Sequence, residues 1–161
     1  MRSERGRRSR FGATKGAVDV LVFACRLVIG VLLMVAGALK IGHAADLAGA
    51  IAGFRLLPAA IVGPLALGLP FLELMLGLYL VLGTFTRVAA TIACVQFLVY
   101  GAAVASAVLR HIPADCGCFG PGDVAVADWP HAAFDVLLAV VSAFIAYRAP
   151  GALSLDRRLR T

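Results

Sequence analysis

The chain has 161 residues, of which 61% are hydrophobic and 15% are charged, and its formal net charge is +6. A water-soluble domain of this length needs more charge to cover its surface, so the composition excludes an ordinary soluble protein. No aromatic or motif-like pattern accompanies the basic residues, which argues against nucleic-acid binding. We interpret the positive charge as a bias in membrane topology together with contact with anionic lipid.

Four long apolar runs account for the composition, and most of them reach the ~20 residues that a helix needs to cross the hydrocarbon core. In chain order they cover residues 17–39, 59–82, 88–109 and 131–147. The sequence therefore predicts an all-α integral membrane four-helix bundle that occupies residues 17–149 as a single membrane domain.

The distribution of basic residues predicts the orientation. Of the 15 Lys and Arg residues, 11 lie before the first run, between the second and third, or after the fourth. The positive-inside rule then makes residues 1–16 and 150–161 basic cytoplasmic tails, in a cell (inner or plasma) membrane. The loops at 40–58 and 110–130 become extracytoplasmic. The first run contains Arg26 and is too long for the central region of a secretory signal, so we interpret it as an uncleaved anchor.

The first extracytoplasmic loop contains a short amphipathic pattern. Leu47, Ile51 and Phe54 recur at helical spacing, and Asp46 and Arg55 lie beside them. This pattern predicts a short interfacial helix that covers the outer end of the bundle as a lid.

Cys116 and Cys118 flank a single glycine in the second extracytoplasmic loop, in the compartment where disulfides persist. A disulfide closed across one glycine forms a small, strained ring, and strained exposed disulfides exchange readily. We therefore interpret the pair as a catalytic thiol–disulfide exchange site. The alternatives are an inert structural disulfide, a metal site completed by His111 or His131, and two thiols without a function. The cysteine spacing differs from that of zinc-binding pairs, so no metal is expected.

Charged residues inside the apolar runs are the second feature. Arg26 and Glu73 each lie about nine residues from the cytoplasmic end of their runs, which places both roughly 13 Å deep. Opposite charges at matched depth are expected to pair, with Gln96 completing a buried polar cluster. The cluster is either a quinone or proton site, or an ion pair that fixes helix register. At about half a bilayer from the cysteine loop, it needs a mobile carrier for any coupling to the thiols.

Other polar residues lie near the outer ends of the runs. A lysine or histidine close to the cysteine pair would favour the thiolate and accelerate exchange. The candidate modulators are Lys40, His43, His111, His131 and Asp135.

Two further cysteines, Cys25 and Cys94, lie in the predicted cytoplasmic half of the spans. They are either members of an electron relay or buried residues that act as small apolar side chains.

Several of these residues occur in an order that resembles a known family. The order is Arg26-x3-Gly30-x6-Gly37-x2-Lys40, Leu57-Pro58, Pro70-x2-Glu73-x3-Gly77-x5-Gly83 and Cys116-Gly117-Cys118-Phe119-Gly120. From about Val20 to Ala149 the chain is similar to the methylamine utilisation protein MauE family, which is related to the DoxX-like four-helix membrane proteins. The cysteine block is the most specific part of the resemblance.

The resemblance implies a membrane protein that works with an extracytoplasmic thioredoxin-like partner. It also implies a role in maturing the disulfide-rich small subunit of methylamine dehydrogenase, or an equivalent client. Cys116 and Cys118 would be the redox pair, and Arg26 and Glu73 the buried polar positions. Two other functions stay open. One is a non-enzymatic scaffold or subunit of a quinone-linked redox complex. The other is a small-molecule or metal transporter, against which the lack of an evident repeat argues.

Overall fold

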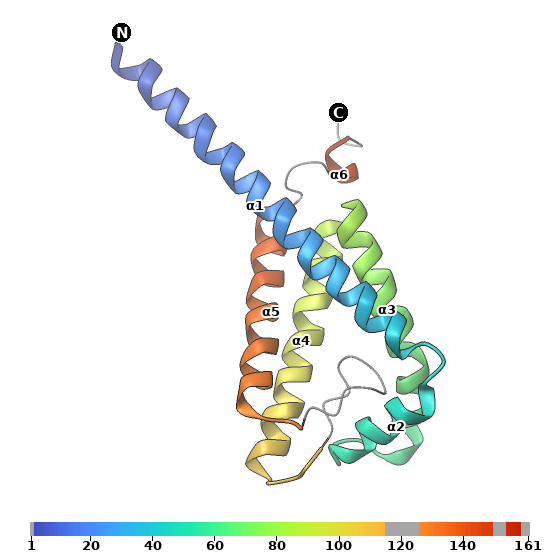
Figure 1. The fold of residues 1–161 in the computed structure, drawn as a ribbon. Helices are drawn as coiled ribbons and strands as arrows, with labels where there is room; N and C mark the ends of the chain where they lie inside the picture. The colour runs from blue at the N-terminus through green and yellow to red at the C-terminus, as the bar shows by residue number, and fades with distance from the viewer. Residues whose placement is uncertain (1, 115–125, 150–153, 159–161) are drawn as a thin grey trace.

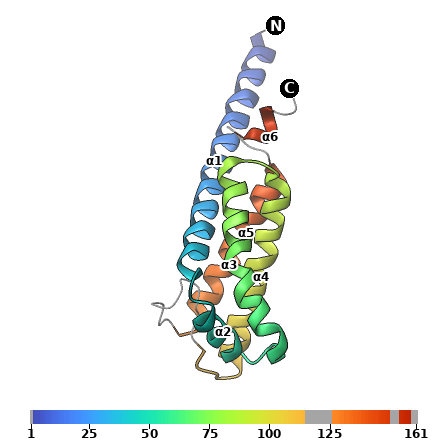
Figure 2. The same cartoon turned by 90° about the vertical axis from the view of Figure 1, so that its right-hand side faces the viewer.

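A computed structural model describes residues 2–114, 126–149 and 154–158, so that Cys116 and Cys118 lie outside the described residues. The regular elements within these ranges are helices. They are α1 (Arg2–Lys40), α2 (Ala44–Gly53), α3 (Ala59–Leu82), α4 (Thr86–Leu109), α5 (Trp129–Arg148) and α6 (Leu155–Arg158). The long helices form an elongated bundle, with both ends of the chain at one end and α2 at the other (Figure 1, Figure 2).

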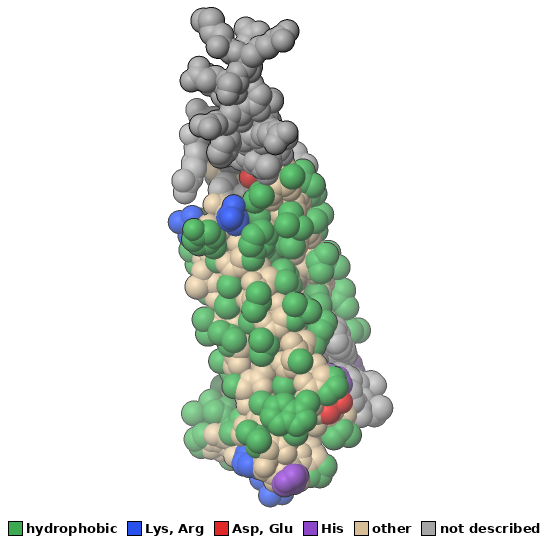
Figure 3. Space-filling model, turned by 90° about the vertical axis from the view of Figure 1, so that its left-hand side faces the viewer, with side chains coloured by type: hydrophobic (Ala, Val, Ile, Leu, Met, Phe, Trp, Pro, Cys, Tyr) green, Lys and Arg blue, Asp and Glu red, His purple; other side chains and the backbone are tan. Residues whose placement is uncertain are grey.

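Four of the helices are long and apolar enough to cross a membrane. These spans are Gly16–Lys40, Ala59–Leu82, Thr86–Leu109 and Trp129–Arg148. Large apolar side chains cover the visible shaft of the bundle, whereas basic and histidine side chains gather towards its ends (Figure 3). Leu67, Phe71 and Val140 are each 60% exposed, as expected for side chains that face lipid. The predicted four-helix membrane bundle is therefore confirmed. The basic segment before residue 17 continues α1 as a helix that projects from the bundle (Figure 1).

The bundle is built from two closely packed pairs, α1 with α3 and α4 with α5. Glycines bring the backbones of α1 and α3 together. A Cβ atom on Gly77 would lie 2.6 Å from the carbonyl oxygen of Gly30, and one on Gly37 would lie 2.7 Å from that of Pro70. Because only glycine permits this approach, these residues fix the register of α1 against α3.

The predicted interfacial helix is confirmed as α2. Its residue Leu47 is buried, and the guanidinium of Arg110 binds carbonyl groups at its C-terminal end. Nη2 of Arg110 donates to the carbonyl of Phe54 at 2.5 Å, and Nη1 to that of Arg55 at 3.5 Å. The start of the loop after α4 is thereby tied to the end of the α2 lid.

The opposite end of the bundle is closed by α6. Asp156 accepts hydrogen bonds from the backbone nitrogens of Phe85 and Thr86, both at 2.9 Å, at the start of α4. Its own backbone nitrogen donates to the carbonyl of Gly83 at 3.1 Å. The C-terminal segment therefore caps α4, whose first N–H groups have no partner inside the helix.

Candidate functional site

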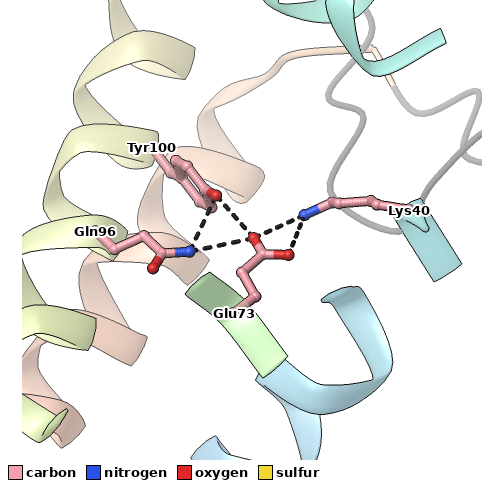
Figure 4. Close-up of polar contacts among 4 residues, drawn as sticks. All are labelled: Lys40, Glu73, Gln96 and Tyr100. Carbon is pink, nitrogen blue, oxygen red and sulfur yellow. Dashed lines mark hydrogen bonds and ion pairs between the residues drawn. The ribbon is translucent and has the colours of Figure 1, made fainter. Parts of the chain in front are cut away.

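A buried polar cluster lies where α1, α3 and α4 meet (Figure 4). Nζ of Lys40 lies 2.8 and 2.9 Å from the two carboxylate oxygens of Glu73. The hydroxyl of Tyr100 donates to Oε1 of Glu73 at 2.7 Å, and Nε2 of Gln96 donates to the same oxygen at 3.1 Å. Lys40 is 3% exposed and Glu73 is 1% exposed. We call these four residues the Glu73 cluster.

The donors around Glu73 offset the cost of placing its charge inside the bundle. A buried ion pair is stable only when good geometry and further hydrogen bonds compensate for lost hydration. Lys40 neutralises the carboxylate, while Tyr100 and Gln96 satisfy one of its oxygens. The Glu73 cluster is thus electrically balanced, with Lys40 as its only cationic side chain.

The predicted pairing of Arg26 with Glu73 is wrong, although the contact between Gln96 and Glu73 is confirmed. The glycine register sets Gly37 of α1 against Pro70 and Glu73, so Glu73 is level with Lys40. The depth estimate assumed that residue 17 marks the membrane edge, but α1 starts at Arg2 and extends past the other helices (Figure 1). Lys40, expected in the outer loop, is the residue that enters the bundle.

Arg26 lies instead at the end of α3. Its side chain is 0% exposed, and its guanidinium lies against Gly83 and over the ring of Phe23, 5.4 Å from the ring centroid. Asp156 attracts it electrostatically. A cation at this position also interacts favourably with the negative end of the α3 dipole. Arg26 therefore fastens the end of the bundle at which the two termini lie.

A large apolar cavity of about 410 Å³ lies beside the Glu73 cluster, between α2, α3 and α4. Leu47, Ile51 and Phe54, the three residues of the predicted amphipathic pattern, line it from α2. Lys40 and Tyr100 are polar groups in its wall. The cavity has the size and the composition of a binding site for a small apolar molecule.

A smaller cavity of about 40 Å³ also reaches the Glu73 cluster. Its polar lining residues are Lys40, Glu73, Tyr100, His131 and Asp135. Lys40 and Tyr100 line both cavities, so the cluster adjoins the large apolar space and a smaller one whose mainly apolar wall also contains ionisable side chains.

The three predicted histidine modulators, His131, His43 and His111, differ in their surroundings. His131 bonds to the Asp128 carboxylate through its backbone nitrogen at 2.9 Å and through its ring at 2.5 Å. These hydrogen bonds hold the pKa of Asp128, the N-cap of α5, below its ordinary value. His43 is exposed beside Asp46, and His111 is exposed in the turn after α4. The structure thus gathers Lys40, His131 and Asp135 at one cavity but leaves His43 and His111 at the surface.

The segment that contains Cys116 and Cys118 lies outside the described residues, but Ala114 and Ala127 on either side of it are described. The backbone nitrogen of Ala127 donates to the carbonyl of Ala114 at 2.9 Å. Both alanines are buried in a small apolar cluster against which Phe54, at the end of α2, also packs. The described residues on either side of the cysteine segment therefore lie at the end of the bundle occupied by the α2 lid.

Cys25 and Cys94 are free and partly buried, and they pack against the apolar core. Among the described residues, no three His, Cys, Asp or Glu side chains lie close enough to bind a metal ion. Tyr100 was missed by the sequence analysis, although its spacing of four residues from Gln96 places it on the same helical face.

Comparisons with known proteins agree with the sequence resemblance. The profile of the methylamine utilisation protein MauE family matches residues 18–148. The chain is 30% identical over 135 residues to methylamine utilization protein MauE of Paracoccus denitrificans, covering 83% of this chain and 73% of that protein. It is 35% identical over 94 residues to the protein of the same name from Methylorubrum extorquens, covering 57% of this chain and 50% of that protein. No solved structure matches.

Proposed function

Because the chain belongs to the family of the methylamine utilisation protein MauE, we propose that it is a membrane thiol–disulfide exchange protein whose redox pair is Cys116 and Cys118. Its partner would be an extracytoplasmic thioredoxin-like protein. The observation that carries the proposal is the position of Ala114 and Ala127, the described residues that flank the cysteine segment, because both lie at the end of the bundle opposite the termini. With the basic termini in the cytoplasm, that end faces the oxidising compartment.

The proposed chemistry is reversible exchange of one disulfide for another. A thiolate attacks one sulfur of a disulfide and expels the other sulfur as a thiolate, which forms a mixed disulfide. The second cysteine of the attacking pair then displaces the first, so that one pair gains a disulfide and the other becomes a dithiol. Two electrons and two protons move in each complete exchange, in whichever direction the partner's potential favours.

A quinone is the proposed lipid-soluble carrier for those electrons. The 410 Å³ cavity under α2 fits an apolar ring and part of its chain, since it is lined mainly by apolar side chains. Lys40 and Tyr100 would hold the carbonyl end. Because Glu73 already neutralises Lys40, the cavity favours a neutral head group over an anionic one. When bound, a quinone supplies an acceptor for two electrons and two protons.

The proposed client is a secreted protein that requires disulfides. The MauE relatives are named for methylamine utilisation, which makes a disulfide-containing component of that process the first candidate. A client of another process, oxidised by the same exchange, fits the same chemistry.

Trapping of mixed disulfides tests the proposed exchange. Single variants Cys116→Ser and Cys118→Ser are expressed in the native membrane, and captured proteins are identified by mass spectrometry. At least one variant is expected to hold a thioredoxin-like protein in a bond that a reductant cleaves. Cys94→Ser, with a partly buried cysteine on α4, serves as the matched control and leaves trapping unchanged.

A scaffold function would give the opposite result. Neither single variant would then trap a partner, and the double variant would still support oxidation of the client. Orientation is tested separately with a membrane-impermeant maleimide added after reduction. Labelling of Cys116 and Cys118 from the cytoplasmic face alone would overturn the proposed topology.

A further inference from the structure

Asp135 is a buried carboxyl group that the proposed thiol chemistry does not use. Its side chain is 5% exposed, and among the described residues its Oδ2 atom has no hydrogen-bond partner. A buried polar atom without a partner is destabilising, because it has lost its hydration and gained no hydrogen bond in return. Such atoms in folded proteins therefore usually bind an ordered water molecule or another polar ligand.

The smaller cavity provides the space and the partners for that water. Its volume of about 40 Å³ exceeds the ~10–15 Å³ that one water molecule requires. Asp135 shares its lining with Lys40, Glu73, Tyr100 and His131, which come from all four spanning helices. The rest of the wall is apolar, so a water molecule there would bind at these polar groups, which distinguish the cavity from a purely apolar void.

The ionisable groups around Asp135 extend from the interior of the bundle to its surface. Lys40 of α1 and His131 of α5 both attract the Asp135 carboxylate, while Glu73 of α3 faces the same cavity. Tyr100 is the titratable group that α4 contributes. His131 lies one helical turn before Asp135, on the same face. It is 36% exposed and bonds to Asp128, which is 50% exposed, so its ring reaches the surface.

We propose that this cavity is hydrated and that Asp135 transfers protons between the Glu73 cluster and His131. The imidazole of His131 takes up a proton from the outer solvent and passes it to the Asp135 carboxylate. Water in the cavity then carries a proton from the Asp135 carboxyl group to the side of Lys40 and Tyr100, where a carrier that is being reduced would consume it. No electron moves in this step, and the cavity regains its original charge after each cycle.

The use of this route rests on the proposed function. Thiol exchange coupled to a quinone-type carrier takes up and releases protons, and Lys40 and Tyr100 line both the carrier cavity and the hydrated one. The existence of the route does not depend on the cysteines, so the two proposals can fail separately.

Infrared spectroscopy of the full chain in lipid nanodiscs tests the route directly. A carboxylic C=O stretching band is expected that titrates with pH and shifts when D₂O replaces H₂O. Asp135→Asn should remove this band, whereas Asp46→Asn, which alters an exposed carboxylate on α2, should leave it intact. His131→Gln should retain the band and slow its shift in D₂O.

Two further variants guard against a trivial failure. In Gly101→Ala the new Cβ would lie 3.2 Å from Cβ of Asp135, so the band should move without disappearing even if Asp135→Asn does not fold. The Cys116→Ser/Cys118→Ser double variant should keep the band and its exchange rate.

A band that does not shift in D₂O, or a D₂O shift unaffected by His131→Gln, would overturn the proton route. Client oxidation that persists in this double variant, with an unchanged band, would instead count against the thiol proposal.

Discussion

The guanidinium of Arg26 lies so close to Gly83 that a Cβ atom on residue 83 would come 2.7 Å from Nη1. Gly83 ends α3 with a φ of 71°, a conformation that disfavours any residue with a side chain. The carbonyl of the same glycine accepts the backbone N–H of Asp156, whose carboxylate caps α4. One glycine therefore joins α1, the α3–α4 turn and α6 at the end of the bundle where the termini lie.

Gly83→Ala is expected to destabilise the protein more than the equivalent change at another glycine with positive φ. Gly42 has a φ of 87° and nothing within 4 Å of its would-be Cβ, so Gly42→Ala isolates the backbone cost. That cost is about 1–2 kcal/mol. Gly83→Ala adds displacement of the buried guanidinium, for a total of about 2–4 kcal/mol. Unfolding of both variants in mixed micelles measures the difference, and equal losses would refute the close contact.

The Lys40–Glu73 pair predicts strong coupling between two buried charges. Lys40→Met and Glu73→Met should each cost about 3–5 kcal/mol, because each leaves one charge inside the bundle without its counterion. The Lys40→Met/Glu73→Met double variant should recover most of that loss. A double-mutant cycle on the free energy of unfolding measures the coupling. Additive losses would show that the two side chains do not form a pair.

Much of the architecture could be predicted because it depends on local patterns. The apolar runs marked the four spans, and the spacing of Leu47, Ile51 and Phe54 marked the α2 lid that now lines the large cavity. These signals reflect the period of a helix and the thickness of a membrane, so they need no information about neighbouring helices.

The partner of Glu73 could not be predicted in the same way. Pairing depends on helix register, which is set by the contacts of Gly30 with Gly77 and of Gly37 with Pro70. Counting residues from the apparent start of an apolar run misplaced Arg26, because α1 begins well before that run. The glycines were visible in the sequence, but their mutual alignment is a property of the packed helices.

Asp156 predicts a local effect on the first turn of α4. In Asp156→Ala the backbone nitrogens of Phe85 and Thr86 lose their acceptors, which should cost about 0.5–2 kcal/mol. Asp156→Asn keeps one acceptor oxygen and should retain part of the cap. Hydrogen exchange at the amides of residues 85 and 86 provides the measurement. Unchanged protection in Asp156→Ala would mean that α6 does not cap this helix in the membrane.

The N-cap of α5 predicts a dependence on acidic pH. Hydrogen bonds from His131 lower the pKa of Asp128 from an ordinary value of 3.8, so the carboxylate is favoured in the folded state. Because the pKa of this carboxyl group is lower in the folded protein than in the unfolded chain, its ionised form stabilises the fold at pH values above the ordinary pKa. That stability is lost as the pH falls through the pKa of the folded protein. The backbone amide of His131 should therefore be protected from hydrogen exchange by Asp128 at neutral pH, and this protection should be lost in strong acid.

Asp128→Asn separates titration from capping at this position. Asparagine caps a helix about as well as aspartate but does not ionise in this range. The variant should therefore keep the protection of the His131 amide at neutral pH and remove the loss that the wild-type protein shows in acid. If the variant and the wild-type protein lost protection together, the acid effect would originate outside the Asp128 cap.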